Sequence, residues 1–157
     1  TYVVRAAEKL RKQHQRAAAL TVYTRTSPFI PAFYSQAASI RLDLPSNDTT
    51  VLLEAALPLV DRIFRPHRQL AKAGVLMQHL QGTELLQSHL LVPLSEAQQQ
   101  RREELMRTID QLNRRYGRGT VQWAACGLHP SWMMRRERLG RTATTRLSDV
   151  PVVHADR

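Results

Sequence analysis

The sequence predicts an α+β fold in which a small sheet, with two helices on one face, precedes a mostly helical C-terminal region. Three segments, near residues 19–26, 38–44 and 70–80, alternate apolar and polar side chains as half-buried strands do. Two others, 1–18 and 49–64, repeat apolar residues every three or four positions, which indicates amphipathic helices. The order is therefore helix, strand, strand, helix, strand, a β-α-β-β-α-β unit that lacks its first strand.

The two helices are expected from Thr1 to about Ala18 and from the possible N-cap residues Ser46–Thr49 to Phe64. Pro58 lies inside the second helix, where it should kink the helix or remove a backbone hydrogen bond.

The outward face of the predicted sheet has the residue types that meet phosphate oxygens. A nucleic-acid backbone could lie on this face, although any sheet face exposed to water has a similar composition. The side chains that alternation places there are Thr21, Tyr23, Arg25, Ser39, Arg41, Lys72, Gly74, Leu76 and Gln78.

Residues 81–95 are predicted to be a linker, because Gln81-Gly82-Thr83 lets the chain turn and Glu84 is the only charged residue of the segment. Within it, Gln87 is followed by Leu90 and Leu91. An extended peptide of this form can place its amide in a polar pocket and its leucines in an apolar one, each worth about 1.5–3 kcal/mol when fully buried. The alternative is that these leucines pack back on the sheet.

The C-terminal region, residues 96–157, is expected to begin with a third helix. Ser95 and Gln98 form a capping box, and Gly117 ends the helix. An apolar stripe runs along it, and a short strand is expected from Gly119 to Ala125. The stripe consists of Leu105, Ile109, Leu112 and Tyr116.

The net charge of +10 and the pI near 11.0 favour a polyanionic partner. Residues 1–80 carry 11 basic and 5 acidic residues, and residues 96–157 carry 12 basic and 7 acidic residues.

The single cysteine, Cys126, excludes an intramolecular disulfide and is expected to be a buried thiol in a reducing compartment. No apolar run is long enough to span a bilayer and there is no signal-peptide pattern, so a soluble, cytoplasmic protein without membrane contact is expected.

The sequence contains no pattern of catalytic chemistry. The six histidines are scattered, no nucleophile motif is present, and the acidic residues lie in unrelated predicted elements. We therefore expect no catalytic residue, metal ligand or cofactor in this chain.

Five segments in a fixed order resemble the C-terminal part of UmuC-like Y-family translesion DNA polymerases, the family of the catalytic subunit of bacterial polymerase V. They are Arg5–Arg11, Thr26–Pro28, Lys72–Val75, Tyr116–Thr120 and Thr144–Asp149. The resemblance implies that residues 1–80 form a little finger domain, which contacts DNA in these polymerases. The family's palm, with its Mg²⁺ and deoxynucleoside triphosphates, has no counterpart in this chain.

The resemblance also implies DNA-binding residues. Lys72 and Gly74 match outward positions of the last little-finger strand, while Leu76 stands where the family often has a basic residue. Tyr23, Arg25 and Arg41 are DNA-binding candidates from the alternation pattern alone. The expected ligand is primer-template DNA.

Protein partners are implied as well. Gln87 and Leu90 match the family's pentapeptide for the β sliding clamp, and Leu91 replaces its usual aromatic residue. The C-terminal region of the family is linked to the UmuD′ dimer and RecA, which makes Trp123, Trp132 and Arg146 candidate interface residues, unless the tryptophans form a small core.

The leading hypothesis is a DNA-binding and clamp-docking module of an SOS repair polymerase near the bacterial nucleoid. The alternative is a protein-interaction platform with little DNA contact.

Overall fold

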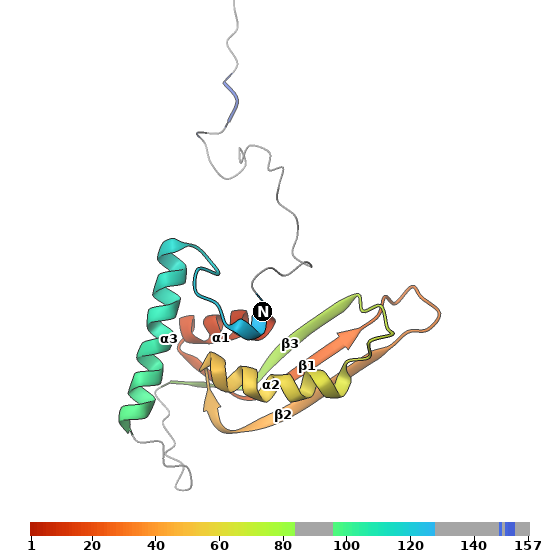
Figure 1. Cartoon of the computed structure of the whole chain (residues 1–157), viewed down its shortest axis with the longest axis horizontal. Coiled ribbons are helices and arrows are strands. Elements are labelled where there is room, and N and C mark those ends of the chain that lie inside the picture. Colours follow the sequence, from red (N-terminus) through yellow and green to blue (C-terminus); the bar gives the residue numbers. More distant parts are fainter. Residues whose placement is uncertain (84–95, 128–147, 149, 153–157) are drawn as a thin grey trace, which may run out of the picture. The chain divides into compact units, whose positions relative to one another are not determined.

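The computed structural model describes residues 1–83, 96–127, 148 and 150–152 (Figure 1). The chain forms two compact units, Thr1–Gln122 and Trp123–Arg157. The predicted α+β class is confirmed. In order, the elements are α1 (Tyr2–Lys12), β1 (Gln15–Arg25), β2 (Ser35–Ser46), α2 (Thr49–Ile63), β3 (Lys72–Gly82), α3 (Glu96–Tyr116) and a short 3₁₀ helix, η1 (Ala124–Cys126).

The three described strands form one antiparallel sheet in the order β2-β1-β3. The predicted extension of the first helix to Ala18 is wrong, because α1 ends at Lys12 and β1 begins at Gln15. His14, with φ of 53°, reverses the chain between them. Residues 15–18 include two alanines that suit a helix, yet this segment pairs with the end of β3 (Gln15 opposite Gly82). The pairing outweighs the local helix preference.

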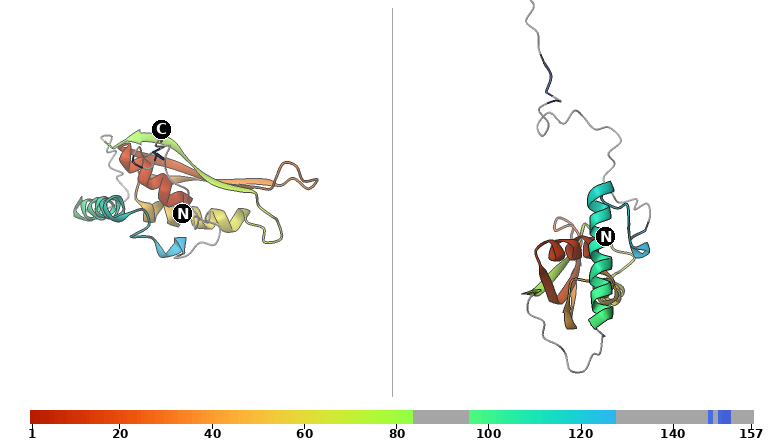
Figure 2. Two further views of the ribbon diagram at one scale, coloured as in Figure 1. Left: turned by 90° about the horizontal axis from the view of Figure 1, so that it is seen from above. Right: turned by 90° about the vertical axis from the view of Figure 1, so that its left-hand side faces the viewer.

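One face of the sheet is covered by α1 and α2, as the left view of Figure 2 shows. The strand residues of this face, Leu20 and Val22, are 0% and 6% exposed. The prediction that two amphipathic helices cover one face of the sheet is therefore confirmed. The core is completed by apolar residues of both helices, which are Val3, Ala7, Leu10, Leu52, Leu53, Ala56, Leu59 and Ile63.

The helix α2 matches its predicted range to within one residue and runs through Pro58 without interruption. Its first turn is capped by Asp48, whose carboxylate accepts a hydrogen bond from the backbone N–H of Thr50 at 2.8 Å. Since Pro58 has no N–H, the helix lacks one backbone hydrogen bond at this position.

The helix α3 is joined to the sheet domain by two arginines. Arg11 donates to both carboxylate oxygens of Asp110, at 2.6 and 2.7 Å, and Arg16 donates to Glu103 at 2.8 Å. Between these two acidic residues Met106 is 3% exposed. Residues 103, 106 and 110 share one helix face, so this face of α3 is the one that packs on the domain.

The predicted apolar stripe of α3 is largely exposed: Leu105 is 54%, Leu112 36% and Tyr116 62% exposed. The helix ends, as expected, before Gly117, which has φ of 107°. The division of the chain at residues 80 and 95 stays a prediction, and the compact unit extends through α3 to Gln122.

The strand predicted from Gly119 to Ala125 is wrong. The chain turns at Gly117 and Gly119, both at positive φ, and the side chain of Asn113 then forms two 2.9 Å hydrogen bonds with the backbone of Val121. These side-chain bonds take the place of a strand partner, and η1 follows. Residues 128–147, 149 and 153–157 of the predicted C-terminal region lie outside the described residues.

Candidate nucleic-acid interface

Four of the five predicted DNA-binding residues lie together at one end of the uncovered sheet face. In the register of the sheet, Arg25 of β1 is opposite Lys72 of β3, and Tyr23 is opposite Gly74. Directly paired residues of an antiparallel sheet point to the same face. Arg25 and Lys72 are exposed, so the two cationic groups are available to solvent. The shared face is as predicted, and contact with DNA stays a prediction.

Arg41 lies on the same face but farther along the sheet. It is opposite Ala19, two positions on this face from Tyr23, and beyond it the register shifts at an irregularity between Ala17 and Ala19. Its side chain is exposed. Arg41 therefore extends the cationic surface toward the other end of the sheet and does not join the Arg25 and Lys72 group.

The ring of Tyr23 lies across Gly74. A Cβ atom at position 74 would be 2.5 Å from the Tyr23 hydroxyl oxygen and 2.6 Å from its Cζ. Only a residue without a side chain allows this approach, because real Cβ atoms do not come so close to another atom. Gly74 thus positions Tyr23 on the surface between the strands.

A hydrogen-bonded row of three polar side chains crosses the same face, which the alternation pattern alone could not predict. Thr21 donates its hydroxyl hydrogen to Gln78 Oε1 at 2.7 Å. Ser39 Oγ lies 2.7 Å from Thr21 Oγ1, and since Thr21 has no second hydrogen, Ser39 is the donor. The row links β2, β1 and β3 and holds them in register.

The cations of this face form no ion pair with a carboxylate of the described residues. In the described part of the chain, ion pairs are formed by Arg11 and Arg16, both with α3. Arg25, Arg41 and Lys72 take part in neither pair. An exposed cation without a carboxylate partner can meet a phosphate oxygen without breaking an existing ion pair.

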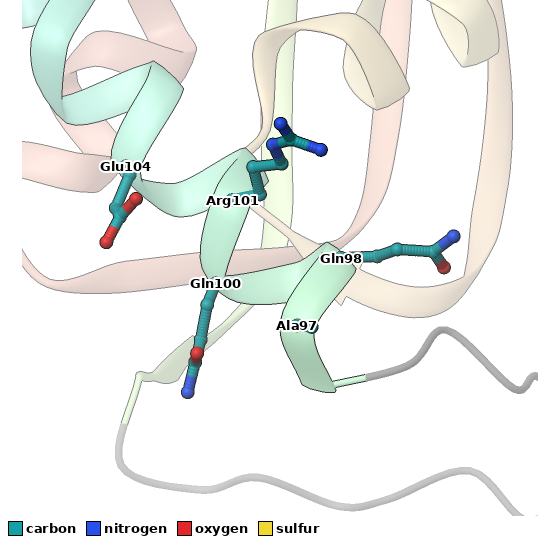
Figure 3. A pocket seen from close by; sticks show the side chains of 5 residues that line it. All are labelled: Ala97, Gln98, Gln100, Arg101 and Glu104. Atoms are coloured by element: carbon teal, nitrogen blue, oxygen red, sulfur yellow. The ribbon is translucent and has the colours of Figure 1, made fainter.

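Among the described residues, no group of three or more His, Cys, Asp or Glu residues could hold a metal ion. The pocket drawn in Figure 3 is an open surface feature whose described lining residues are exposed and belong to α3; these are Ala97, Gln98, Gln100, Arg101 and Glu104. No helix in the described ranges has the length and apolar character needed to cross a bilayer.

The predicted protein-binding residues are mostly outside the described ranges. Gln87, Leu90 and Leu91, as well as Trp132 and Arg146, belong to segments that the structure does not describe. Trp123 is described: it is half-buried and precedes η1 in the second compact unit, where its carbonyl accepts a hydrogen bond from the N–H of Cys126 at 2.9 Å. The thiol-bearing residue Cys126 is itself half-buried.

The family to which the chain belongs is shown by comparison with known protein families. The C-terminal domain of the impB/mucB/samB family matches residues 1–90, which include the whole sheet and the helices α1 and α2. The chain belongs to the impB/mucB/samB family. A domain of unknown function, DUF4113, matches residues 103–153, which begin inside α3.

Individual members of the impB/mucB/samB family align with nearly the whole chain. UmuC of Salmonella typhimurium is 34% identical over 152 residues, ImpB of the same species is 36% identical over 153, and SamB is 37% identical over 149. These alignments cover 94–96% of this chain but only 34–36% of the relatives. The resemblance to UmuC-like proteins is therefore confirmed, and the chain spans about a third of their length.

Proposed function

We propose that this chain is the DNA-binding and clamp-docking part of an error-prone Y-family DNA polymerase that acts in SOS mutagenesis and DNA repair. The observation that carries the proposal is the group of Arg25, Lys72, Tyr23 and Gly74 on the uncovered sheet face of a member of the impB/mucB/samB family. The proposed ligand is primer-template DNA in a bacterial nucleoid. Mg²⁺ and deoxynucleoside triphosphates are assigned to the polymerase as a whole and not to residues of this chain.

The physical basis of the DNA contact is electrostatic. Lys72 and Arg25 lie side by side in the sheet and have no carboxylate partner in the described part of the chain, and the chain as a whole carries a net charge of +10. Each phosphate that such a cation neutralises releases counterions, which makes binding sensitive to salt. Tyr23, whose ring lies across Gly74, adds an aromatic surface beside these cations, on which a backbone can lie closely.

The test is the salt dependence of binding to primer-template DNA. Lys72→Ala should reduce the slope of log K against log salt by about one. Lys9→Ala is the matched control, because Lys9 is exposed on α1, outside the proposed face, and its slope should remain that of the unmodified chain. An unchanged slope for Lys72→Ala would remove Lys72 from the interface.

Clamp docking is assigned to Gln87, Leu90 and Leu91. The support is their match to the clamp-binding pentapeptide and the low charge of residues 81–95. A weak peptide contact and a weak DNA contact reinforce each other, since linked sites raise the effective concentration into the mM range for short linkers. Calorimetric titration with purified β clamp tests this point: binding should be lost in the Gln87→Ala/Leu90→Ala variant. Absence of binding by the unmodified chain would exclude clamp docking.

A second candidate function is a platform for protein partners, and the exposed apolar stripe of α3 favours it. Leu105, Leu112 and Tyr116 lie within the region that matches DUF4113. Under this proposal the UmuD′ dimer or RecA binds residues 96–157, with Trp123, Trp132 and Arg146 as contacts. Capture of such a partner should survive Lys72→Ala and be lost on truncation after Gly117. The opposite result would favour the DNA-binding function alone.

A further inference from the structure

The loop between β1 and β2 presents large apolar side chains to solvent at one end of the sheet. Phe29 is 93% exposed, the highest value among the large apolar residues that the structure describes, and Phe33 and Ile30 are 55% and 40% exposed. Figure 1 shows this loop projecting past the end of α2. Exposed aromatic residues gathered on one loop are unusual for a surface without a binding role.

The base of the loop is fixed by its own hydrogen bonds. The backbone N–H of Thr26 donates to the carbonyl of Tyr34 at 2.9 Å, and the N–H of Tyr34 donates to Thr26 Oγ1 at 2.9 Å. The hydroxyl of Tyr34 donates to the carbonyl of Ile63 at 2.9 Å, which ties the loop to the end of α2. Phe29 and Phe33 therefore extend from an anchored base, which limits the entropy that a bound partner must overcome.

The charged residues of the loop and of the segment beside it are all basic. Residues 25–34 and 62–72 contain no aspartate or glutamate, and the two segments are adjacent, because the N–H of Ala71 donates to the carbonyl of Arg25 at 2.9 Å. Arg68 lies over the ring of Tyr34, 5.3 Å from its centre. The exposed basic residues are Arg25, Arg62, Arg65, Arg68 and Lys72.

The basic residues around the loop differ in the hydrogen bonds that they already form. Arg65 donates to the backbone carbonyls of Arg62 and Phe64 at the end of α2, so part of its role is to cap the helix. Arg25 and Lys72 belong to the uncovered sheet face, which meets the loop at this end. The loop is therefore continuous with the proposed DNA-binding face.

We infer that the loop of residues 27–33 is a contact for unpaired nucleobases, on which Phe29 and Phe33 stack while the surrounding cations hold the phosphates. The inference rests on the proposed DNA-binding function and adds a single-stranded substrate to it. Combined aromatic and cationic groups are the means by which proteins bind single strands. Duplex DNA offers no unstacked base to such a loop. Since phenylalanine cannot form hydrogen bonds with base edges, the contact is indifferent to sequence.

The experiment compares two labelled probes, an oligothymidine strand and a blunt duplex, bound to the 157-residue chain and followed by fluorescence anisotropy. The Phe29→Ala/Phe33→Ala variant should bind the single strand at least about fivefold more weakly, the effect of one lost stacking contact. Its duplex affinity should change by less than about twofold, because the phosphate contacts remain. Leu57→Ala on α2, at a residue 48% exposed, is the control for loss of an exposed apolar side chain and should change neither affinity.

A second variant separates stacking from simple apolar contact. Phe29→Leu/Phe33→Leu keeps apolar surface but removes the aromatic rings, and it should lose single-strand affinity as the alanine variant does. An unchanged single-strand affinity in the alanine variant overturns the inference and favours a protein partner for the loop. An equal loss on both probes overturns it too, because the contact is then not specific to unpaired bases.

The two proposals fail independently. If Lys72→Ala leaves the salt slope on primer-template DNA unchanged while the Phe29→Ala/Phe33→Ala variant binds the single strand more weakly, the proposed contact of the sheet face is wrong and the loop contact stands. If the slope falls as expected and the loop variant binds both probes normally, the loop contact is wrong and the sheet face stands.

Discussion

On the face of β1 that α1 and α2 cover, Leu20 is fully buried and Val22 is 6% exposed, whereas on the opposite face Arg25 is exposed and Tyr23 is half-buried. The same strand supplies both sets of residues, alternating along its length. The covered face stabilises the fold by removing apolar surface from water. The uncovered face leaves its cations available, so it can bind a ligand while contributing little to stability.

This difference explains why polar groups behave differently on the two faces. The hydroxyl of Thr21, on the uncovered face, joins Ser39 and Gln78 in a hydrogen-bonded row. The hydroxyl oxygen of Thr24 is on the covered side and has no hydrogen-bond partner among the described residues. Two threonines three residues apart in one strand are thus expected to respond in opposite ways to loss of the hydroxyl.

The largest expected difference in unfolding free energy is between alanine substitutions of two leucines on opposite faces of the sheet. Leu20→Ala should lower the free energy of unfolding by about 2–5 kcal/mol, because it leaves a cavity in the core. Leu76→Ala, at a residue 52% exposed on the uncovered face, should lower it by no more than about 0.5 kcal/mol. Urea denaturation of both variants measures the difference. Equal losses would mean that the uncovered face is also packed in solution.

The next effect concerns the attachment of α3 on the covered side. Asp110→Ala should cost about 1–3 kcal/mol of unfolding free energy, because the Arg11 side chain, only 12% exposed, loses the carboxylate it donates to. Glu104→Ala, at an exposed residue of the same helix, is the control and should lie within about 0.5 kcal/mol of the unmodified chain. Thermal denaturation can measure both variants. A similar small loss for both would indicate that α3 is held mainly by Met106 and the Arg16–Glu103 ion pair.

The two threonines provide the third comparison. Thr21→Val should destabilise the fold by about 0.5–1.5 kcal/mol, because it removes the hydroxyl that links three strands. Thr24→Val should be neutral or stabilising, since a buried hydroxyl without a partner costs free energy in the folded state. Both substitutions keep the branched shape. Chemical denaturation curves recorded side by side measure the two changes, and a loss in Thr24→Val would reveal a hydrogen bond to water.

The smallest effect tests the contact of Tyr23 with Gly74. Gly74→Ala should cost about 0.5–1 kcal/mol, because the new methyl group displaces the Tyr23 ring from the sheet. In a Tyr23→Ala background the same substitution should be neutral or slightly stabilising, since alanine loses less conformational freedom on folding than glycine. A double-mutant cycle measures this coupling. The absence of coupling would mean that Tyr23 does not lie across Gly74 in solution.

Local pattern was sufficient for much of the fold. Alternation in β1 and β3 predicted which side chains share the uncovered face, and the register of Tyr23 with Gly74 and of Arg25 with Lys72 agrees. The range of α2 and the end of α3 before Gly117 were also predicted. These features depend on neighbours within a few residues, through side-chain period, capping and the glycine backbone.

Features that depend on distant partners were decided only by the tertiary structure. Residues 15–18 form a strand because they pair with residues near position 80 of β3, and local alanine content favoured a helix. The buried face of α3 is set by Arg11 and Arg16, roughly a hundred residues earlier, and not by the helix's own apolar stripe. The exposure of the Phe29 and Phe33 side chains, in a segment whose two prolines predict a loop, was also decided only by the tertiary structure. A local pattern records the preference of a segment, whereas its burial depends on which other surface it meets when the chain closes.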